Sequence, residues 1–264
     1  MSKVNLITGG GGGIGFECAK KFVGEKLYIT GRNEEKLSVK CKELRDLGVD
    51  ANYKVSDISK PEEVEQLFEE ITKEGDLGCV LNAAGISGVG VTGEKVFKID
   101  LLGAKKVLDT TLEYATQNTV LILIASIMGY VVPPNEIYDK YLAEPDLEGA
   151  YKVLKFYLDD PNQAYNFCKR GNHLMVTKFA MDFGAKGARL LSISPGIIET
   201  PMSAAAMEEA SEIMNQMLAI TPIGRFGKPE EITNTVEFLK GEKASFITGS
   251  DILIDGGLLH QMIK

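Results

Sequence analysis

The chain has 264 residues, 44% of them hydrophobic and 25% charged, and its formal net charge is −8 at pH 7. These ordinary globular values exclude a disordered or collagen-like chain. The negative charge argues against a broad surface for nucleic acid or anionic membranes. The four cysteines have no CxxC spacing and no histidine cluster beside them, so neither a disulfide framework nor a metal site is predicted.

The apolar segments are short. The longest, Val120–Ala125, has six residues and cannot span a bilayer, and no apolar signal-peptide core follows Met1. An α/β fold of this length does not have to split. We therefore expect a single domain over residues 1–264, in a cytoplasmic protein with buried thiols.

Aliphatic runs alternate with amphipathic segments, which is typical of βαβ units and a parallel sheet. Strands are predicted at residues 4–8, 26–30, 51–55, 79–82, 119–125, 189–194 and 252–254, and the later helices at 162–183, 203–219 and 229–240. The fold class is therefore α/β, with a Rossmann-type doubly wound parallel sheet of about seven strands flanked by helices. A helical insertion, about residues 130–161, is predicted between Ser126 and Tyr165.

A glycine run, Thr8-Gly9-Gly10-Gly11-Gly12-Gly13-Ile14-Gly15, follows the first predicted strand and opens a helix. Backbone N–H groups in such a loop can cradle a pyrophosphate, because glycine permits close approach of the backbone to a ligand. A flexible turn is the structural alternative. The strand-turn-helix setting favours dinucleotide binding, although the spacing departs from GxGxxG.

This loop resembles the TGxxxGIG loop of short-chain dehydrogenases/reductases, and further similarities follow in the family's order across essentially the whole chain. They are Asp57-Ile58, Asn82-Ala83-Ala84-Gly85, Pro195-Gly196-Ile197-Ile198-Glu199-Thr200-Pro201, Ile247-Thr248-Gly249 and Asp255-Gly256-Gly257. The resemblance implies a nicotinamide dinucleotide cofactor. The implied contacts are Thr8, Gly9, Gly13, Ile14, Gly15, Asp57, Ile58, Asn82, Ala83, Gly85, Pro195, Gly196, Ile198 and Thr200.

The end of the second strand indicates which dinucleotide binds. An acidic residue there favours NAD, whereas an arginine accommodates the 2′-phosphate of NADP. Gly31-Arg32-Asn33 offers no acid, so Arg32 predicts NADP(H) as the preferred cofactor. NAD(H), with Arg32 as a solvated surface residue, stays open because the glycine loop lacks the additional basic residue that many NADP-using relatives carry.

Two tyrosine-lysine pairs have the spacing of a proton donor and a cation on one helical face. They are Tyr151/Lys155 and Tyr165/Lys169, and the spacing does not choose between them. In the family, the pair opens a long helix and precedes the Pro-Gly loop by about thirty residues, which selects Tyr165 and Lys169. The lysine charge would favour the phenolate form of the tyrosine, and the resemblance implies that both residues also contact the cofactor.

Ser126 ends an apolar strand, where its hydroxyl can donate to a substrate oxygen as charge develops; capping of the strand end is the structural alternative. Relatives usually carry an asparagine that holds a water-linked proton relay. Asp100, within Ile99-Asp100-Leu101-Leu102-Gly103, occupies that position here. It is a candidate catalytic residue that could hold the water or alter the ionisation of Lys169.

The spacing from Ser126 to Tyr165 is 39 positions, and the long aromatic-rich insertion resembles the bacterial 3α-hydroxysteroid dehydrogenase/carbonyl reductase branch. That branch acts on bulky apolar ketones and alcohols. A helical hairpin over the site and a methionine-rich lid at residues 202–217 would both suit such a substrate. The alternatives are a purely structural flap and methionines that belong to the core. A 3-oxoacyl-carrier-protein reductase, a general carbonyl reductase and a non-catalytic NADP(H) sensor are the alternatives, and we expect a homo-oligomer, dimer or tetramer.

Overall fold

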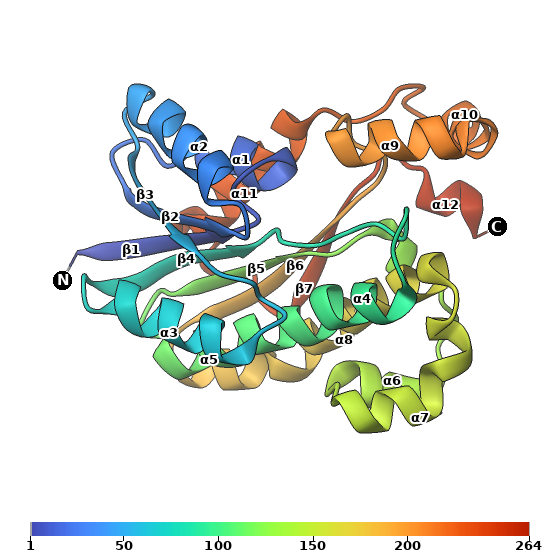
Figure 1. Ribbon diagram of the computed structural model, residues 1–264, viewed down its shortest axis with the longest axis horizontal. Coiled ribbons are helices and arrows are strands. Elements are labelled where there is room, and N and C mark those ends of the chain that lie inside the picture. The colour runs from blue at the N-terminus through green and yellow to red at the C-terminus, as the bar shows by residue number, and fades with distance from the viewer. Residues whose placement is uncertain (1, 264) are drawn as a thin grey trace.

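The computed structural model describes residues 2–263, without the side chains of residues 147, 148, 150–152, 205, 206 and 209. Seven parallel strands form the central sheet (Figure 1). They are β1 (Lys3–Thr8), β2 (Lys26–Gly31), β3 (Asp50–Val55), β4 (Asp76–Asn82), β5 (Val120–Ile124), β6 (Arg189–Pro195) and β7 (Ser250–Ile254). Each predicted strand is present, with bounds that differ by a few residues.

The strand order is β3-β2-β1-β4-β5-β6-β7, so the order reverses between β1 and β4. The register places Thr8, at the end of β1, opposite Thr30 on β2 and Asn82 on β4. Ligands of open parallel sheets bind at the carboxyl ends of the strands beside such a reversal. The predicted Rossmann-type fold is therefore confirmed, and it brings the glycine loop and Asn82 to the edge where ligands bind.

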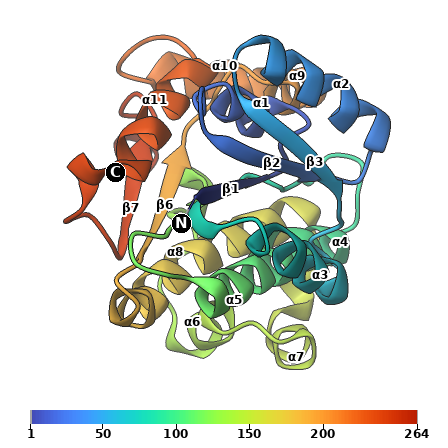
Figure 2. The ribbon, with the colours of Figure 1, turned by 90° about the vertical axis from the view of Figure 1, so that its left-hand side faces the viewer.

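Helices cover both faces of the sheet, and each layer has its own apolar core (Figure 2). One layer contains α1 (Gly13–Ala19), α2 (Glu34–Asp46) and α11 (Pro229–Lys240), and the other contains α3 (Pro61–Thr72), α5 (Ala104–Tyr114) and α8 (Pro161–Ala185). The shorter segments are α4 (Gly93–Phe97), the π-helical η1 (Lys98–Gly103), the 3₁₀ turns η2 (Ile127–Gly129) and η3 (Glu242–Ala244), and α12 (Leu259–Met262). The two layers fix the sheet from both sides.

The long helix α8 begins one residue before its predicted start and ends two residues after its predicted end. The Asp160 side chain accepts the N–H groups of Asn162 and Gln163, and Pro161 occupies the first helical position, where its missing N–H costs nothing. This cap sets the helix phase. Tyr165 and Lys169 consequently lie one turn apart on the same side of α8.

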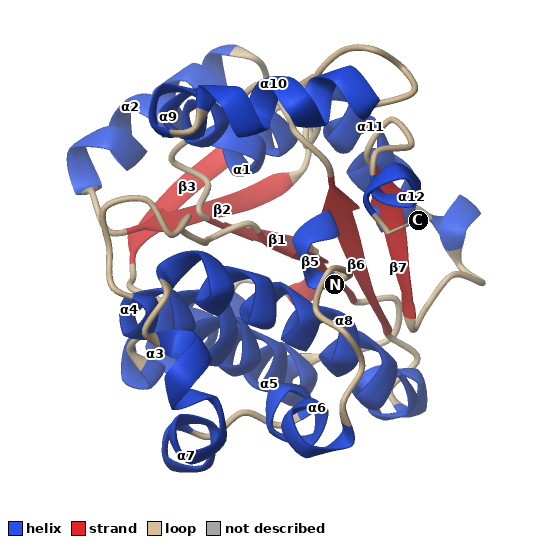
Figure 3. Cartoon of the chain, turned by 90° about the vertical axis from the view of Figure 1, so that its right-hand side faces the viewer, coloured by secondary structure: helices blue, strands red, loops and turns tan. Residues whose placement is uncertain are grey.

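The methionine-rich segment forms two helices instead of the single predicted one. α9 (Pro201–Glu209) and α10 (Ser211–Ile220) are separated by Ala210, whose backbone is not helical. They lie on the same side of the sheet as α1 and α2 (Figure 3). No glycine or proline marks the break, so the apolar spacing runs through it and the sequence does not reveal it.

The insertion forms the expected helical hairpin, α6 (Glu136–Ala143) and α7 (Leu147–Leu158), which lies beside α8 (Figure 1). Two of its aromatic side chains pack against α8. The rings of Tyr138 and Tyr157 lie 5.1 and 4.5 Å from that of Phe167, measured between centroids. Phe167 lies two positions from both Tyr165 and Lys169, and therefore on the opposite side of the helix. These contacts correct the prediction that the hairpin aromatics cover the site.

The remaining composition-based expectations concern membranes and thiols. Among the described residues, no helix has the length and apolarity needed to cross a bilayer. Cys18, Cys41, Cys79 and Cys168 are all free and buried, as predicted. Burial raises the pKa of Cys79 to about 12, so its thiol stays protonated and unreactive.

Candidate active site

The structure brings Tyr165, Lys169 and the Ser126 loop together at the carboxyl end of β5. Lys169 Nζ donates a hydrogen bond to the carbonyl oxygen of Ile124, at 3.1 Å, and lies 5.2 Å from the centroid of the Tyr165 ring. Gly129, three residues after Ser126, packs so closely on α8 that a Cβ there would lie 2.7 Å from the carbonyl carbon of Lys169. The three predicted catalytic residues therefore share one site.

Ser126 is buried, and its Oγ accepts the N–H of Met128 at 3.2 Å. This contact matches the capping role that the sequence left open. A hydroxyl that accepts one hydrogen bond still has its own hydrogen available for another. The serine can therefore cap η2 and still donate to a bound oxygen.

Asp100 enters the same site from η1, where the helix is locally widened to the π form. Its Oδ1 accepts the N–H of Ile86 at 2.9 Å, and its Oδ2 forms an ion pair with Lys169 Nζ at 3.3 Å. Burial raises the pKa of Asp100, although the Lys169 charge opposes that effect. Burial favours the neutral amine of Lys169, yet the Asp100 carboxylate beside it holds the pKa of that amine above its usual value.

The two sides of the glycine loop differ in how closely other residues pack against them. Gly9 has φ +68°, and a Cβ there would lie 2.8 Å from the carbonyl oxygen of Ala83, so only glycine fits. At Gly13, with φ +53°, a Cβ would meet no atom within 4 Å. The loop is thus tightly packed on its β4 side and open on the side where a ligand would lie.

Thr8 and Asn82 connect the loop to β4. The Thr8 hydroxyl donates to Asn82 Oδ1 at 2.6 Å and accepts the N–H of Ala84 at 3.1 Å. Gly85 follows, and a Cβ there would lie 2.9 Å from Asp100 Oδ2. The segment from Asn82 to Gly85 therefore contacts the glycine loop at one end and the Asp100–Lys169 ion pair at the other.

The predicted adenosine contacts lie after β2 and β3. Asp57 Oδ1 accepts the N–H and hydroxyl of Ser59; although burial acts against it, these bonds hold the pKa of Asp57 below its usual value. Ile58 is buried, and both its side chain and its carbonyl oxygen pack against Gly103, so its cofactor contact stays a prediction. Arg32 forms no ion pair with a described carboxylate.

The predicted nicotinamide loop follows β6, which ends at Pro195. The Gly196 N–H donates to the carbonyl oxygen of Ile254, and Ile198 packs on Gly227. Thr200 exchanges hydrogen bonds with Ser203, so its hydroxyl caps the start of α9. Thr200 and Ile198 therefore have structural contacts of their own, and their cofactor contacts stay predictions.

One feature of the site was missed by the sequence reasoning. Lys36, in the first turn of α2, extends over the glycine loop, with Nζ 3.0 Å from the position of a Cβ on Gly12. The loop sequence carries no sign of this contact, because Lys36 lies four positions after Arg32 in a different element.

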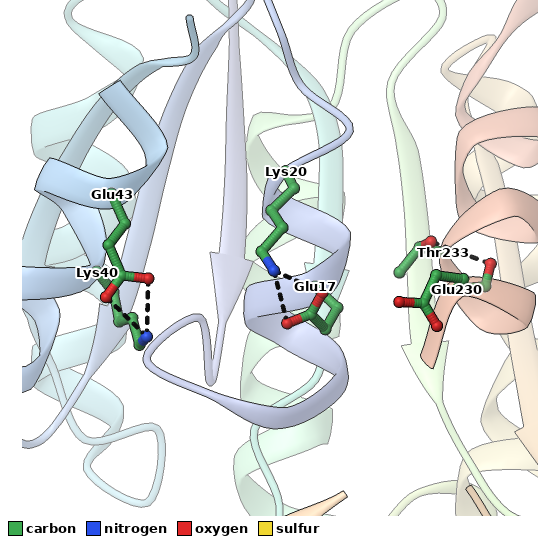
Figure 4. A network of polar contacts seen from close by, with 6 residues as sticks. All are labelled: Glu17, Lys20, Lys40, Glu43, Glu230 and Thr233. Atoms are coloured by element: carbon green, nitrogen blue, oxygen red, sulfur yellow. Dashed lines mark hydrogen bonds and ion pairs between the residues drawn. The ribbon is translucent and has the colours of Figure 1, made fainter. Parts of the chain in front are cut away.

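Ion pairs lie on either side of the turn between β1 and α1 (Figure 4). Lys20 pairs with Glu17 on α1 at 2.8 Å, and Lys40 pairs with Glu43 on α2 at 2.9 Å. Both lysine amines also lie over the Phe16 ring. These amines are therefore held in ion pairs, whereas neither Arg32 nor Lys36 forms an ion pair with a described carboxylate.

Comparison with known proteins agrees with this geometry. The family model described as short chain dehydrogenase matches residues 3–139, just over half of the chain, and the model described as Enoyl-(Acyl carrier protein) reductase matches residues 150–259. Cyclohexanol dehydrogenase of Acinetobacter sp. is 30% identical over 97% of this chain and 94% of its own length. The 3-oxoacyl-(acyl-carrier-protein) reductase FabG of Aquifex aeolicus is 29% identical over 98% of each chain.

Solved structures give the same result. A variant of actinorhodin polyketide ketoreductase, crystallised with NADPH, superposes with a TM-score of 0.79 and 26% identity over 97% of each chain. A short-chain dehydrogenase/reductase from Mycobacterium ulcerans has a TM-score of 0.78, also at 26% identity, over 98% of this chain and 92% of its own. With its parallel sheet, its glycine loop and these matches, the chain belongs to the short-chain dehydrogenase/reductase family of oxidoreductases.

Proposed function

We propose that the protein is an NADP(H)-dependent oxidoreductase that interconverts a secondary alcohol and a ketone. The observation that carries this proposal is the position of Lys169, whose amine is hydrogen-bonded to the end of β5 and faces the Tyr165 ring. With Lys169 beside it, Tyr165 can act as the proton donor. Ser126, at the end of the strand, supplies a second hydrogen-bond donor. Carbonyl reduction needs that combination.

The cofactor would supply the hydride, and the residues of the chain would handle the proton and the charge on oxygen. Tyr165 gives its hydroxyl proton to the oxygen of the carbonyl as negative charge develops there. Ser126 donates its free hydrogen to the same oxygen, and Lys169 favours the resulting phenolate. In alcohol oxidation the same groups act in reverse, with Tyr165 as the base.

The residues at the carboxyl edge fit a dinucleotide. The open side of Gly13 leaves room for a pyrophosphate, and the hydroxyls of Thr30 and Ser56 are buried at the ends of β2 and β3 without a hydrogen-bond partner. Arg32, at the end of β2, adds a free cation where a 2′-phosphate would lie. These features support NADP(H) as the preferred cofactor.

The proposed substrate is a bulky apolar ketone or alcohol such as a hydroxysteroid. Since the hairpin packs behind α8, the support for this substrate comes from the methionine-rich helices alone. Met217 of α10 packs against a small apolar cluster of Ile127, Leu258 and Leu259, on which Met128 and Ile197 from the loops after β5 and β6 also pack. An adaptable apolar surface beside those loops suits such a molecule. Relatives named FabG and ketoreductase favour a second candidate, the reduction of a 3-oxoacyl thioester.

The decisive experiment is NADPH oxidation with steroid ketones, small aromatic ketones and acetoacetyl thioesters. Turnover of steroid ketones supports the first substrate, and turnover with thioesters alone replaces it with the second. Tyr165→Phe should reduce kcat by at least about a hundredfold while the Kd for NADPH stays unchanged. Tyr151→Phe, from the competing pair, is the control and should keep full activity. NADPH binding without turnover on any substrate would instead indicate a sensor.

A further inference from the structure

The Lys36 side chain crosses from α2 to the glycine loop. Asn33 caps α2 by accepting the Lys36 N–H at 2.8 Å, which fixes the first turn of the helix. From there the side chain extends so that Cδ lies 3.8 Å from the position of a Cβ on Gly11, and Nζ lies 3.0 Å from that of a Cβ on Gly12. The amine therefore occupies the space that a side chain at position 12 would fill.

The charge of this amine is not neutralised. No described carboxylate pairs with either Lys36 or Arg32, whereas Lys40, one turn further along α2, is paired with Glu43 (Figure 4). Glu34 and Glu35 stand in the same turn as Lys36. Because their negative charges oppose the binding of an anion, one arginine alone is a weak anion site here, and a second free cation strengthens it.

We infer that Lys36 is the second cation that selects NADP(H), binding its 2′-phosphate together with Arg32 and replacing the basic side chain that the loop lacks at Gly12. This inference rests on the proposed function. The amine comes from a helix that follows the loop in the chain, which is why the loop sequence does not show it. A flexible ammonium binds phosphate as a point charge, so it does not need the fixed geometry of a guanidinium.

The experiment measures the Kd of NADPH and of NADH by isothermal titration calorimetry, with no turnover involved. Lys36→Met removes the charge and keeps the apolar stem over the loop. We expect the Kd for NADPH to rise about tenfold or more, the size of one lost charge-assisted contact, and the Kd for NADH to change by less than about twofold. Lys40→Met, the matched control on the same helix, should leave both constants unchanged.

A rescue variant separates a specific contact from a general disturbance. Gly12 has φ 174°, an extended conformation that any residue adopts, and within 4 Å of a Cβ there the described part of the chain places atoms of Lys36 alone. Gly12→Arg in the Lys36→Met background should therefore restore the preference for NADPH without strain.

Each remaining outcome is informative. An equal loss of affinity for both dinucleotides, or an unchanged Kd for NADPH, would overturn the role of Lys36 while leaving the proposed oxidoreductase intact. A wild-type chain that binds NADH as tightly as NADPH would overturn the NADP(H) preference and this inference together. Thermal melting of every variant shows whether the fold is retained.

Discussion

Replacing Asp100 by asparagine should shift the pH dependence of catalysis to lower pH. Asparagine has the same shape and can keep the hydrogen bond from the Ile86 N–H, but it removes the negative charge beside Lys169. A negative charge near an acidic group disfavours the loss of its proton. Once the Asp100 charge is removed, the positive charge of Lys169 should favour loss of the Tyr165 proton without an opposing effect.

The magnitude follows from two distances. Asp100 Oδ2 lies 3.3 Å from Lys169 Nζ, which lies 5.2 Å from the Tyr165 ring centroid, so the carboxylate is at most about 8.5 Å from the ring. At an effective dielectric constant of about 20, two unit charges at that separation interact by about 2 kcal/mol. One pKa unit corresponds to 1.36 kcal/mol, so the expected shift is about one pH unit or more.

The assay is kcat/KM for alcohol oxidation across the pH range, because that ratio reports the ionisation of the free enzyme. The rise of the rate with pH should occur about one unit lower in Asp100→Asn. Asp109→Asn is the matched control, because Asp109 is a partly exposed carboxylate paired with Lys105 on α5. An unchanged profile would show that Asp100 carries no charge at these pH values. A shift to higher pH would refute the reasoning, since Asp100 would then act by keeping Lys169 protonated.

Three further predictions test other parts of the structure. Ser126→Ala should lower kcat by about a hundredfold to a thousandfold, as removal of one donor to a developing oxyanion does, with the Kd for NADPH unchanged in a fluorescence titration. Phe167→Ala should cost about 3–5 kcal/mol of unfolding free energy in a urea titration, because the hairpin aromatics pack on this ring; a cost below about 1 kcal/mol would mean that the hairpin is not anchored there. Gly9→Ala should abolish dinucleotide binding or unfold the chain, because its φ is +68° and its Cβ would clash with the Ala83 backbone; wild-type binding and melting would contradict the tight packing described for the loop.

The sequence predicted the sheet and the position of its site well, because both depend on local patterns. Short aliphatic runs ending in Thr8, Asn82 and Ser126 already gave the strands and their carboxyl ends. The Tyr165/Lys169 spacing could be read as one helical face. Each of these patterns involves residues only a few positions apart in the sequence.

Contacts between distant segments could not be predicted in this way. The aromatic pattern of the insertion indicated a buried face but not the surface against which it packs, which proved to be Phe167 on α8. The contact of Lys36 with Gly12 depends on how α2 packs over the loop. The effect of Asp100 on Lys169 was expected only through the family resemblance, because their ion pair depends on how η1 faces α8. Each requires the assembled sheet and its helical layers.

The hairpin behind α8 has a consequence for assembly. Asp139 forms a bidentate ion pair with Arg170, and the Leu142 carbonyl lies close to Gly171, so the contacts between hairpin and helix are polar as well as aromatic. The hairpin of the same chain thus covers the first half of α8. A second copy that docked on the first half of α8 would have to displace the hairpin, so self-association through that surface would compete with the chain's own fold.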